Sequence, residues 1–369
     1  MRLKFRPTRL DDLSPCFAII RDKFVYDSEM QVKLLRLWRE LLTRRCATSA
    51  VIEDHERRGE HRLVGFGMSA FVTDEFARAA KRGVLPYITR RALEGWSGGA
   101  SPFLTLGDIQ RANSGEGLNC LVMHYGLAKH VWDTDDAVFV WNCLMEAFIH
   151  QHRGYQLKEI IDEVYGESDL RGLLTLGAKL VTDYGTSLKK ASPPPPPDRR
   201  PYLIGVTREG VRTQDVVTYS TPLFAYTPPR FHLTLAEQDL LEHALEGATD
   251  ENLASELKIS LTAVKKRWST IYQRVDAVDP DLVSGPFDTV SEGKRGAEKR
   301  RGLLAYLRDH PEELRPAAPP KASMASRATS RAVAARASHS PPPGSSESGW
   351  RDRNEAYISA PGRRSRPTD

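Results

Sequence analysis

Short runs of apolar residues, separated by polar turns, follow one another through the first half of the chain. Residues 3–5 predict a short strand, and two apolar runs within 50–72, divided by the charged turn HERRGEH, predict a hairpin. Further apolar runs at 118–127, 157–164 and 178–184 predict three more strands. We therefore expect a sheet in this part of the chain.

Helical spacing appears between these predicted strands. Asp11 or Asp12 can cap a helix that contains Cys16. Residues 136–150 predict a longer helix, and 170–176 a short one, because apolar residues recur there at helical intervals, as at Val140, Leu144, Ala147 and Phe148. Helices and strands thus alternate, which predicts an α/β domain with a mixed sheet over residues 1–188.

Two segments have compositions that do not favour a packed core. Residues 189–201 hold five consecutive prolines and predict a semi-rigid linker. The tail, 316–369, is rich in Ala, Ser, Pro and Arg and is expected to be disordered. Between them, 202–230 is either a small strand pair, from apolar runs at 202–206 and 223–226, or an irregular strap.

Three closely spaced helices are predicted within residues 231–315, an all-α unit. Thr234 can cap the first helix, and with Glu237 it forms the T-x-x-E pattern of a capping box. Gly247 ends this helix, since glycine adopts positive φ easily, and Thr249 caps the second.

The third helix is amphipathic and basic. It follows a tight turn, is capped by Ser260 or Thr262 and extends to about Val275, with Val264, Trp268 and Ile271 on its inward face. A short basic helix after such a turn fits a helix that reads the major groove of DNA. The predicted DNA-binding residues are Thr262, Lys265, Lys266, Arg267, Ser269, Gln273 and Arg274.

The run LTLAEQDLLEHALEGATDENLASELKISLTAVKKRWSTIYQRV resembles the LuxR/FixJ-type helix-turn-helix domain. The matching positions are Leu233, Thr234, Glu237, Gly247, Leu253, Ala254, Leu257, Ile259, Ser260, Val264, Lys265 and Ile271. The resemblance implies a DNA-binding domain of four helices, whose third helix reads bases. It further implies that Lys265, Lys266 and Ser269 face base edges, while Thr262 and Arg267 lie near phosphates.

The chain departs from this family at two points. Arg267 stands where the family has a histidine, and the bulky Trp268 follows it. A polar loop, 276–292, separates the third helix from the segment 296–310, which has leucines on one face and basic residues on the other. This segment could replace the fourth helix, which is the usual dimer contact, so ordinary dimerisation is in doubt.

The N-terminal part resembles the fold of GNAT-type acetyltransferases, through its opening L-K-F-R-P-x-x-x-x-D and its order of strands and helices. That family holds the pyrophosphate of acyl-CoA with Q/R-x-x-G-x-G/A after a central strand. The corresponding residues here, 128–136, contain no glycine, and the Q-x-x-G at 151–154 lies at the wrong end of the helix. We therefore expect a GNAT-like sensor or scaffold domain that is not an enzyme and has no cofactor.

Other candidate sites are weak. Cys120 and His124 could pair as nucleophile and base, but they lie in an apolar strand with no third residue nearby in sequence. His150 and His152 could bind a metal but fit a solvated helix end better, so no catalytic residue or metal ligand is assigned. A last group fits the core or an aromatic-lined ligand pocket, namely Tyr125, Trp132, Trp141, Phe139 and Phe148.

Composition adds limits to this picture. The 369 residues carry a net charge of only +5, so the placement of the basic residues matters more than their number. No apolar run approaches the roughly 18 residues of a membrane span, and the N-terminus has no signal-peptide pattern. The four cysteines form no metal-ligand pattern, which fits thiols in a reducing cytoplasm.

The sequence as a whole predicts a bacterial transcriptional regulator that is cytoplasmic and nucleoid-associated and binds double-stranded DNA. RNA polymerase, a small-molecule effector and a second copy of the chain are further candidate partners, whereas a membrane is not. Two alternatives stay open. The chain could be a GNAT-type acyltransferase with an appended DNA-binding domain, or a sigma-factor-like promoter-recognition protein.

Overall fold

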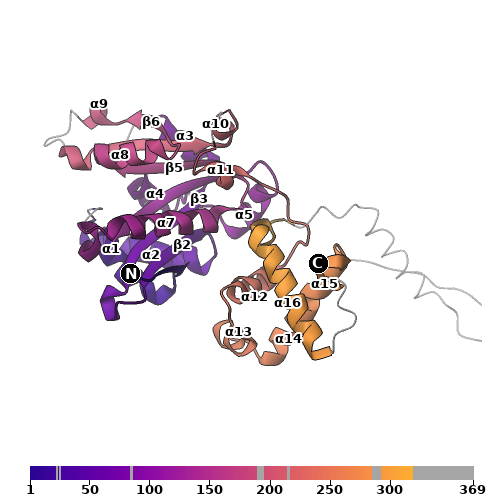
Figure 1. The fold of residues 1–369 in the computed structure, drawn as a ribbon. Helices are drawn as coiled ribbons and strands as arrows, with labels where there is room; N and C mark the ends of the chain where they lie inside the picture. Colours follow the sequence, from indigo (N-terminus) through magenta and orange to yellow (C-terminus); the bar gives the residue numbers. More distant parts are fainter. Residues whose placement is uncertain are drawn as a thin grey trace, which may run out of the picture. The chain divides into compact units, whose positions relative to one another are not determined.

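A seven-stranded mixed sheet forms the centre of the N-terminal part (Figure 1). This computed structural model describes residues 1–21, 24, 26–83, 86–188, 195–213, 217–284 and 292–318. The strand order is β1-β2-β3-β4-β5-β7-β6. The strands are β1 (Leu3–Pro7), β2 (Ala47–Asp54), β3 (Leu63–Val72), β4 (Leu118–Leu127), β5 (Leu157–Tyr165), β6 (Lys179–Asp183) and β7 (Pro201–Thr207).

The directions of the strands divide the sheet in two. The pairs β1–β2, β2–β3 and β3–β4 are antiparallel. Strands β4 and β5 are parallel, and β7 is antiparallel to both β5 and β6. The predicted strands at 3–5, 50–72, 118–127, 157–164 and 178–184 are all present; the run 118–127 keeps its predicted ends, and the ends of the others are shifted. Their order is the one that the resemblance to GNAT-type acetyltransferases implies.

Strand β7 corrects the expected boundary of this domain. Residues 202–206 belong to β7, which lies between β5 and β6 in the main sheet, so the N-terminal domain does not end at residue 188. The predicted partner run at 223–226 forms no strand and overlaps the short helix α11 (Thr221–Phe224). Periodicity could not reveal this arrangement, because β7 pairs with strands that precede the proline-rich segment. The linker residues 189–194 and the tail from 319 onward lie outside the described residues.

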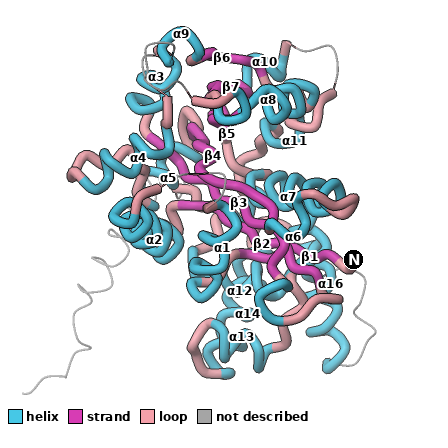
Figure 2. The backbone as a smooth tube through the Cα atoms, turned by 90° about the vertical axis from the view of Figure 1, so that its left-hand side faces the viewer, coloured by secondary structure: helices cyan, strands magenta, loops and turns pink. Residues whose placement is uncertain are grey.

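Helices cover both faces of the sheet (Figure 2). Successive side chains of β2 point to opposite faces of the sheet, and both faces are apolar. Val51 packs in one hydrophobic cluster, while its neighbours Ala50 and Ile52 pack in another, so both faces need helices to cover them. The cluster that contains Val51 includes helices α1 (Leu13–Ile20), α2 (Ser28–Thr43), α3 (Asp74–Lys81), α4 (Ile88–Ser97) and α5 (Leu106–Asn113). The opposite face holds α6 (Lys129–Trp132) and α7 (Ala137–His152), and α8 (Gly166–Thr175) packs on β5 and β7.

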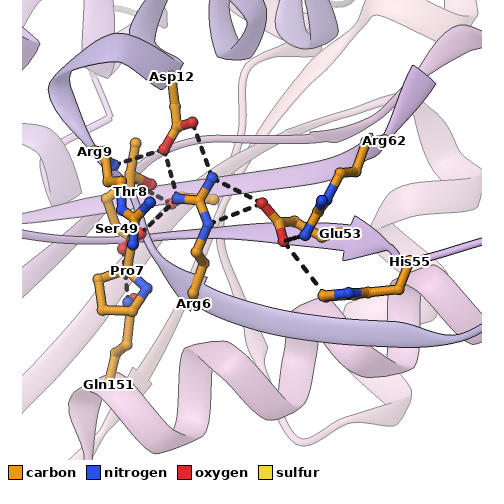
Figure 3. A network of polar contacts seen from close by, with 11 residues as sticks. Arg6, Pro7, Thr8, Arg9, Asp12, Ser49, Glu53, His55, Arg62 and Gln151 are labelled. Atoms are coloured by element: carbon orange, nitrogen blue, oxygen red, sulfur yellow. Dashed lines mark hydrogen bonds and ion pairs between the residues drawn. The ribbon is translucent and has the colours of Figure 1, made fainter. Parts of the chain in front are cut away.

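Arg6 of β1 forms ion pairs with two carboxylates (Figure 3). The Arg6 guanidinium donates to Asp12 at 2.6 Å and to Glu53 at 2.9 Å. Asp12 therefore binds Arg6 instead of capping α1 through its side chain, although it stands at the N-cap position. The ion pair with Arg6 of β1 thus accounts for Asp12.

Within the described residues, seven α-helices follow β7. The short α10 (Arg208–Arg212) and α11 precede α12 (Leu235–Leu245), α13 (Asp250–Glu256) and α14 (Leu261–Asp276). The capping box of Thr234 and Glu237 is confirmed, and Thr249 and Ser260 cap the next two helices. Thr262, the other candidate cap, is exposed inside α14.

These helices enclose a hydrophobic cluster of their own, which we call the helical cluster, running from Phe231 to Leu314. Val264, Trp268 and Ile271 are buried in it, as their spacing predicts. The predicted polar loop 276–292 contains the short helix α15 (Pro280–Ser284), and 285–291 lie outside the described residues. Leucines 303, 304 and 307 of α16 (Glu292–Asp309) are buried in the helical cluster, so this helix packs on the others. No helix within the described ranges is long and apolar enough to cross a membrane.

Candidate functional site

The sheet opens between its two parallel strands. β4 and β5 pair from Leu118 and Leu157 as far as Val122 and Asp162. Both strands are described throughout, and β4 continues to Leu127 without a partner on β5. Unpaired strand edges leave backbone amide and carbonyl groups available to an extended ligand. This opening is the candidate site.

A β-bulge lies next to the opening. On β3, Met68 pairs with His124 and Ser69 pairs with Val122, so Met123 is an extra residue on β4. The Met123 carbonyl oxygen accepts a hydrogen bond from the Thr89 hydroxyl at 3.2 Å. A bulge turns the residues that follow it and bends the strand. It therefore accounts for the separation of β4 from β5.

A cavity of about 120 Å³ lies beneath α7 and α8, at the opening. Its wall is mostly apolar and includes Trp141, Leu144 and Phe148 of α7 and Leu173 of α8. Gly67 of β3 lies on its floor, where the absence of a side chain leaves room. The few polar groups at the wall are Thr48, Ser69, His124, Gln151, His152, Asp162 and Ser220.

His124 is the most unusual of these polar groups. It is fully buried, and its Nε2 shares a hydrogen bond of 2.9 Å with the Tyr26 hydroxyl. Its ring packs against Phe24 and Trp38, and its Nδ1 has no hydrogen-bond partner among the described residues. Burial lowers the pKa of His124 to about 3, so the imidazole is neutral at physiological pH. A buried nitrogen without a partner fits a group that a ligand completes.

Two carboxylates lie side by side in sequence on β5 but have different environments. Glu163 accepts hydrogen bonds from the backbone N–H groups of Tyr87 and Ile88, both at 3.0 Å, and so caps α4. It also accepts one from the Tyr165 hydroxyl at 2.7 Å, which makes Glu163 structural. Asp162 instead lines the cavity on the other face, and burial together with this carboxylate raises the pKa of Tyr125.

The N-terminus of α7 does not fit a diphosphate. Helix N-termini attract phosphate, but Asp136 stands at the N-cap position of this helix, and Asp133 and Asp135 precede it. Arg57 lies 3.7 Å from Asp136 and also binds Asp54 at 3.0 Å, so its charge is shared between carboxylates. The three carboxylates would repel a diphosphate, as the missing glycines also indicate.

The structure does not support the nucleophile or the metal site that the sequence offered as candidates. Burial raises the pKa of Cys120 to about 12, so this residue is a thiol and a poor nucleophile. His152 is not at a solvated helix end: it is 1% exposed and hydrogen-bonds to Thr48 at 2.9 Å and to the Phe148 carbonyl group at 2.7 Å. Over the residues that the structure describes, no three His, Cys, Asp or Glu side chains gather as a metal site would require.

The aromatic residues also separate into two groups. Tyr125, Trp141 and Phe148 line the cavity. Trp132 and Phe139 are 48% and 61% exposed, so they belong neither to the core nor to the cavity. Sequence reasoning did not single out Tyr26 or Asp162. Nothing in the local pattern distinguishes them, because the sheet brings them to the opening from distant segments.

The predicted DNA-binding residues lie along α14. Thr262, Lys265, Lys266, Ser269 and Gln273 are exposed, and Arg267 is half-buried. Arg274 differs from the others because its Nε lies 3.3 Å from the Glu237 carboxylate, the same group that completes the capping box of α12. This ion pair makes Arg274 less available to a phosphate. These positions are consistent with a basic surface on α14 but do not by themselves identify its ligand.

No family model matches the chain, and no curated protein sequence matches it. Solved structures are similar to it over about half its length. The C-terminal condensation domain of Ebony, in complex with beta-alanyl-dopamine, is 13% identical with a TM-score of 0.36, covering 56% of this chain and 99% of that one. Arabidopsis thaliana NAA60, in complex with acetyl-CoA, is 16% identical with a TM-score of 0.34, covering 56% and 98%. FeeM, an N-acyl amino acid synthase from uncultured soil microbes, is 10% identical with a TM-score of 0.32, covering 57% and 94%.

These matches do not support the expectation that the chain is not an enzyme. The matching structures include the N-acyl amino acid synthase and a spermidine N-acetyltransferase chimera. At such identities and TM-scores the likeness says nothing of this chain's activity, and what the structure shows is a mixed α/β domain. The inference behind the expectation was wrong because the missing glycines at 128–136 disfavour one way of binding a diphosphate and do not exclude acyl transfer.

Proposed function

We propose that the sheet domain transfers an acyl group from a pantetheine thioester to an amine at the opening between β4 and β5. The observation that carries this proposal is the separation of the two strands beyond Val122 and Asp162, with an apolar cavity at that point. A pantetheine arm is extended and contains two amides. It can therefore pair with free strand edges while its thioester lies beside the cavity.

The reaction needs a positioned acceptor and a group that takes its proton. The amine nitrogen attacks the thioester carbonyl carbon, a C–N bond forms, the C–S bond breaks, and the thiol leaves with a proton. Asp162 is suited to receive the proton of the amine, because it is a carboxylate at the cavity wall.

The donor that fits best is a thioester without a diphosphate at α7. The arm is common to coenzyme A and to carrier-protein thioesters, but Asp133, Asp135 and Asp136 disfavour phosphate groups at this helix. We therefore expect S-acylpantetheine to bind at least as tightly as the corresponding coenzyme A thioester. Asp136→Asn should improve binding of the coenzyme A thioester and leave S-acylpantetheine unaffected.

Turnover tests this proposal. The full chain is incubated with S-acetylpantetheine and a set of primary amines, and mass spectrometry follows the amide product and the released thiol. Wild type should form product, and Asp162→Asn should lose at least tenfold in kcat with little change in donor affinity. Loss of donor affinity alone, or no product with any amine, would count against transfer at this site.

DNA binding is a second candidate function, supported by α14. Its exposed face carries Lys265, Lys266, Ser269 and Gln273. The opposite face is buried and carries Val264, Trp268 and Ile271. Phosphate contacts by such lysines would supply salt-dependent affinity. Titration of the full chain with duplex DNA at two salt concentrations tests this. Salt-independent binding, or none, would leave α14 as a solvated basic surface.

A further inference from the structure

The segment that joins β7 to the helical cluster passes over the cavity. We propose that residues 217–224, here called the strap, close the donor site and must be displaced before a thioester arm can enter. This inference rests on the proposed function. It assigns the strap an autoinhibitory role in the uptake of the donor.

The strap is held in place by apolar side chains. Leu223 is 3% exposed and Phe224 is 9% exposed, and both belong to the same hydrophobic cluster of the sheet domain as Val51. Ser220 and Leu223 line the cavity, and helix α11 contacts both α7 and β5 (Figure 1). Strap residues Ser220 and Leu223 therefore form part of the wall of the cavity beside which the proposed thioester would lie.

Polar contacts hold the strap weakly. Among the described residues, each hydrogen bond of the strap joins strap residues to one another. The Thr218 backbone N–H donates to the Thr221 hydroxyl at 2.9 Å, and the hydroxyls of Thr218 and Ser220 are 2.9 Å apart. A segment without backbone hydrogen bonds to the sheet can leave at a lower cost than a strand can.

The size of the cavity indicates that the strap must move. Its volume is about 120 Å³, and Leu223 and Ser220 form part of its wall. An acyl group at the end of the arm would have to share this space with the strap. Removal of the Leu223 side chain would open the space that the arm needs.

Three full-length variants test the proposal, with S-octanoylpantetheine as the probe and calorimetry as the measurement. Leu223→Ala removes the buried contact and should tighten binding at least tenfold. Thr221→Val keeps the volume of the side chain but removes the hydroxyl that accepts from Thr218, and should tighten binding about threefold. Val217→Ala is the control, because Val217 is 82% exposed on the same segment and its loss should change nothing.

Hydrogen exchange supplies a second readout on the wild type. Exchange of the backbone amides within 217–224 should rise when the probe binds. Tighter binding by the variants cannot result from unfolding, since an unfolded chain would bind less, and circular dichroism confirms that each variant is folded.

The possible results distinguish failure of the strap proposal from failure of the donor-site proposal. If wild type binds the probe and both strap variants bind it equally or more weakly, the strap proposal is overturned and the donor site stands. Slower exchange of 217–224 on binding would also overturn it, because the strap would then close over the ligand. If neither wild type nor Leu223→Ala binds the probe, the donor site itself is wrong, and the strap proposal fails with it.

Discussion

Val122 on β4 and Asp162 on β5 are the last residues through which these parallel strands pair. Up to that point the strands form a continuous sheet. Past it the β-bulge at Met123 turns β4 away, and a small apolar cavity lies at the gap. This single relationship places His124 and Asp162, from different strands, at one opening.

Filling the cavity should weaken binding of the donor. Gly67→Val places a side chain on the cavity floor, where a Cβ alone would already lie 3.2 Å from Leu144 Cδ1. We expect at least tenfold weaker binding of S-octanoylpantetheine by calorimetry. Overpacking should also cost about 1–3 kcal/mol of stability.

A glycine outside the cavity provides the control. A Cβ at Gly172 of α8 would meet nothing within 4 Å, so Gly172→Ala should bind the probe like wild type. If Gly67→Val is folded and also binds normally, the arm does not occupy this cavity.

The buried histidine should make stability depend on pH. The unfolded chain protonates a histidine near pH 6.5, whereas folded His124 stays neutral down to about pH 3. The unfolded state therefore binds more protons between these values. The contribution of His124 is fully present above pH 6.5 and is lost as the pH falls towards 3.

Replacement by glutamine isolates this contribution. Between pH 7 and pH 5, the drop in the free energy of unfolding should be about 2 kcal/mol smaller for His124→Gln than for wild type. His61→Gln, at an exposed position, should behave like wild type. Denaturant unfolding at the two pH values gives the comparison, and equal drops for wild type and His124→Gln would show that His124 is not buried as a neutral group.

Arg315 should contribute strongly to stability. This residue is 9% exposed, and its guanidinium donates to the carbonyl groups of Arg153 at 2.8 Å and His150 at 2.9 Å, at the end of α7. Charged donors at a helix C-terminus are favourable, and hydrogen bonds of this kind contribute about 1.5–3 kcal/mol. Arg315→Ala should lower Tm by several degrees. Arg171→Ala, whose side chain is 80% exposed, should not.

Lys265 should contribute to DNA binding if α14 reads the major groove. Lys265→Ala should cost about 1–3 kcal/mol against a preferred duplex and reduce sequence discrimination. Arg267→Ala should weaken binding to all duplexes alike and flatten the salt dependence. Lys33→Ala on α2 is the control. Fluorescence anisotropy measures all three, and identical affinities for Lys265→Ala and Lys33→Ala would argue against the proposed contact.

Local patterns predicted local structure well. The run 118–127 forms β4 with the predicted ends, and Thr234 and Glu237 cap α12 as their spacing indicates. Helices α2, α3, α4 and α5 were not predicted. The pairing of β7 was missed as well, because strand neighbours far apart in sequence leave no periodic signal.

The candidate site was predicted less well, for a physical reason. A β-bulge depends on the register between β3 and β4, which the sequence of either strand does not specify. His124 was noticed only as a possible partner of Cys120, whereas its hydrogen bond goes to Tyr26, nearly a hundred residues away. Such contacts follow from topology, so sequence reasoning could name the histidine but could not give it a role.

Hydrogen exchange on the full chain, with and without S-octanoylpantetheine, tests the central claim most directly. The account predicts slower exchange of backbone amides at 123–127 of β4 and 163–165 of β5, where these two strands do not pair with each other, with little change in α14. Protection confined to other elements, or no change at saturating probe, would contradict a donor site between these strands.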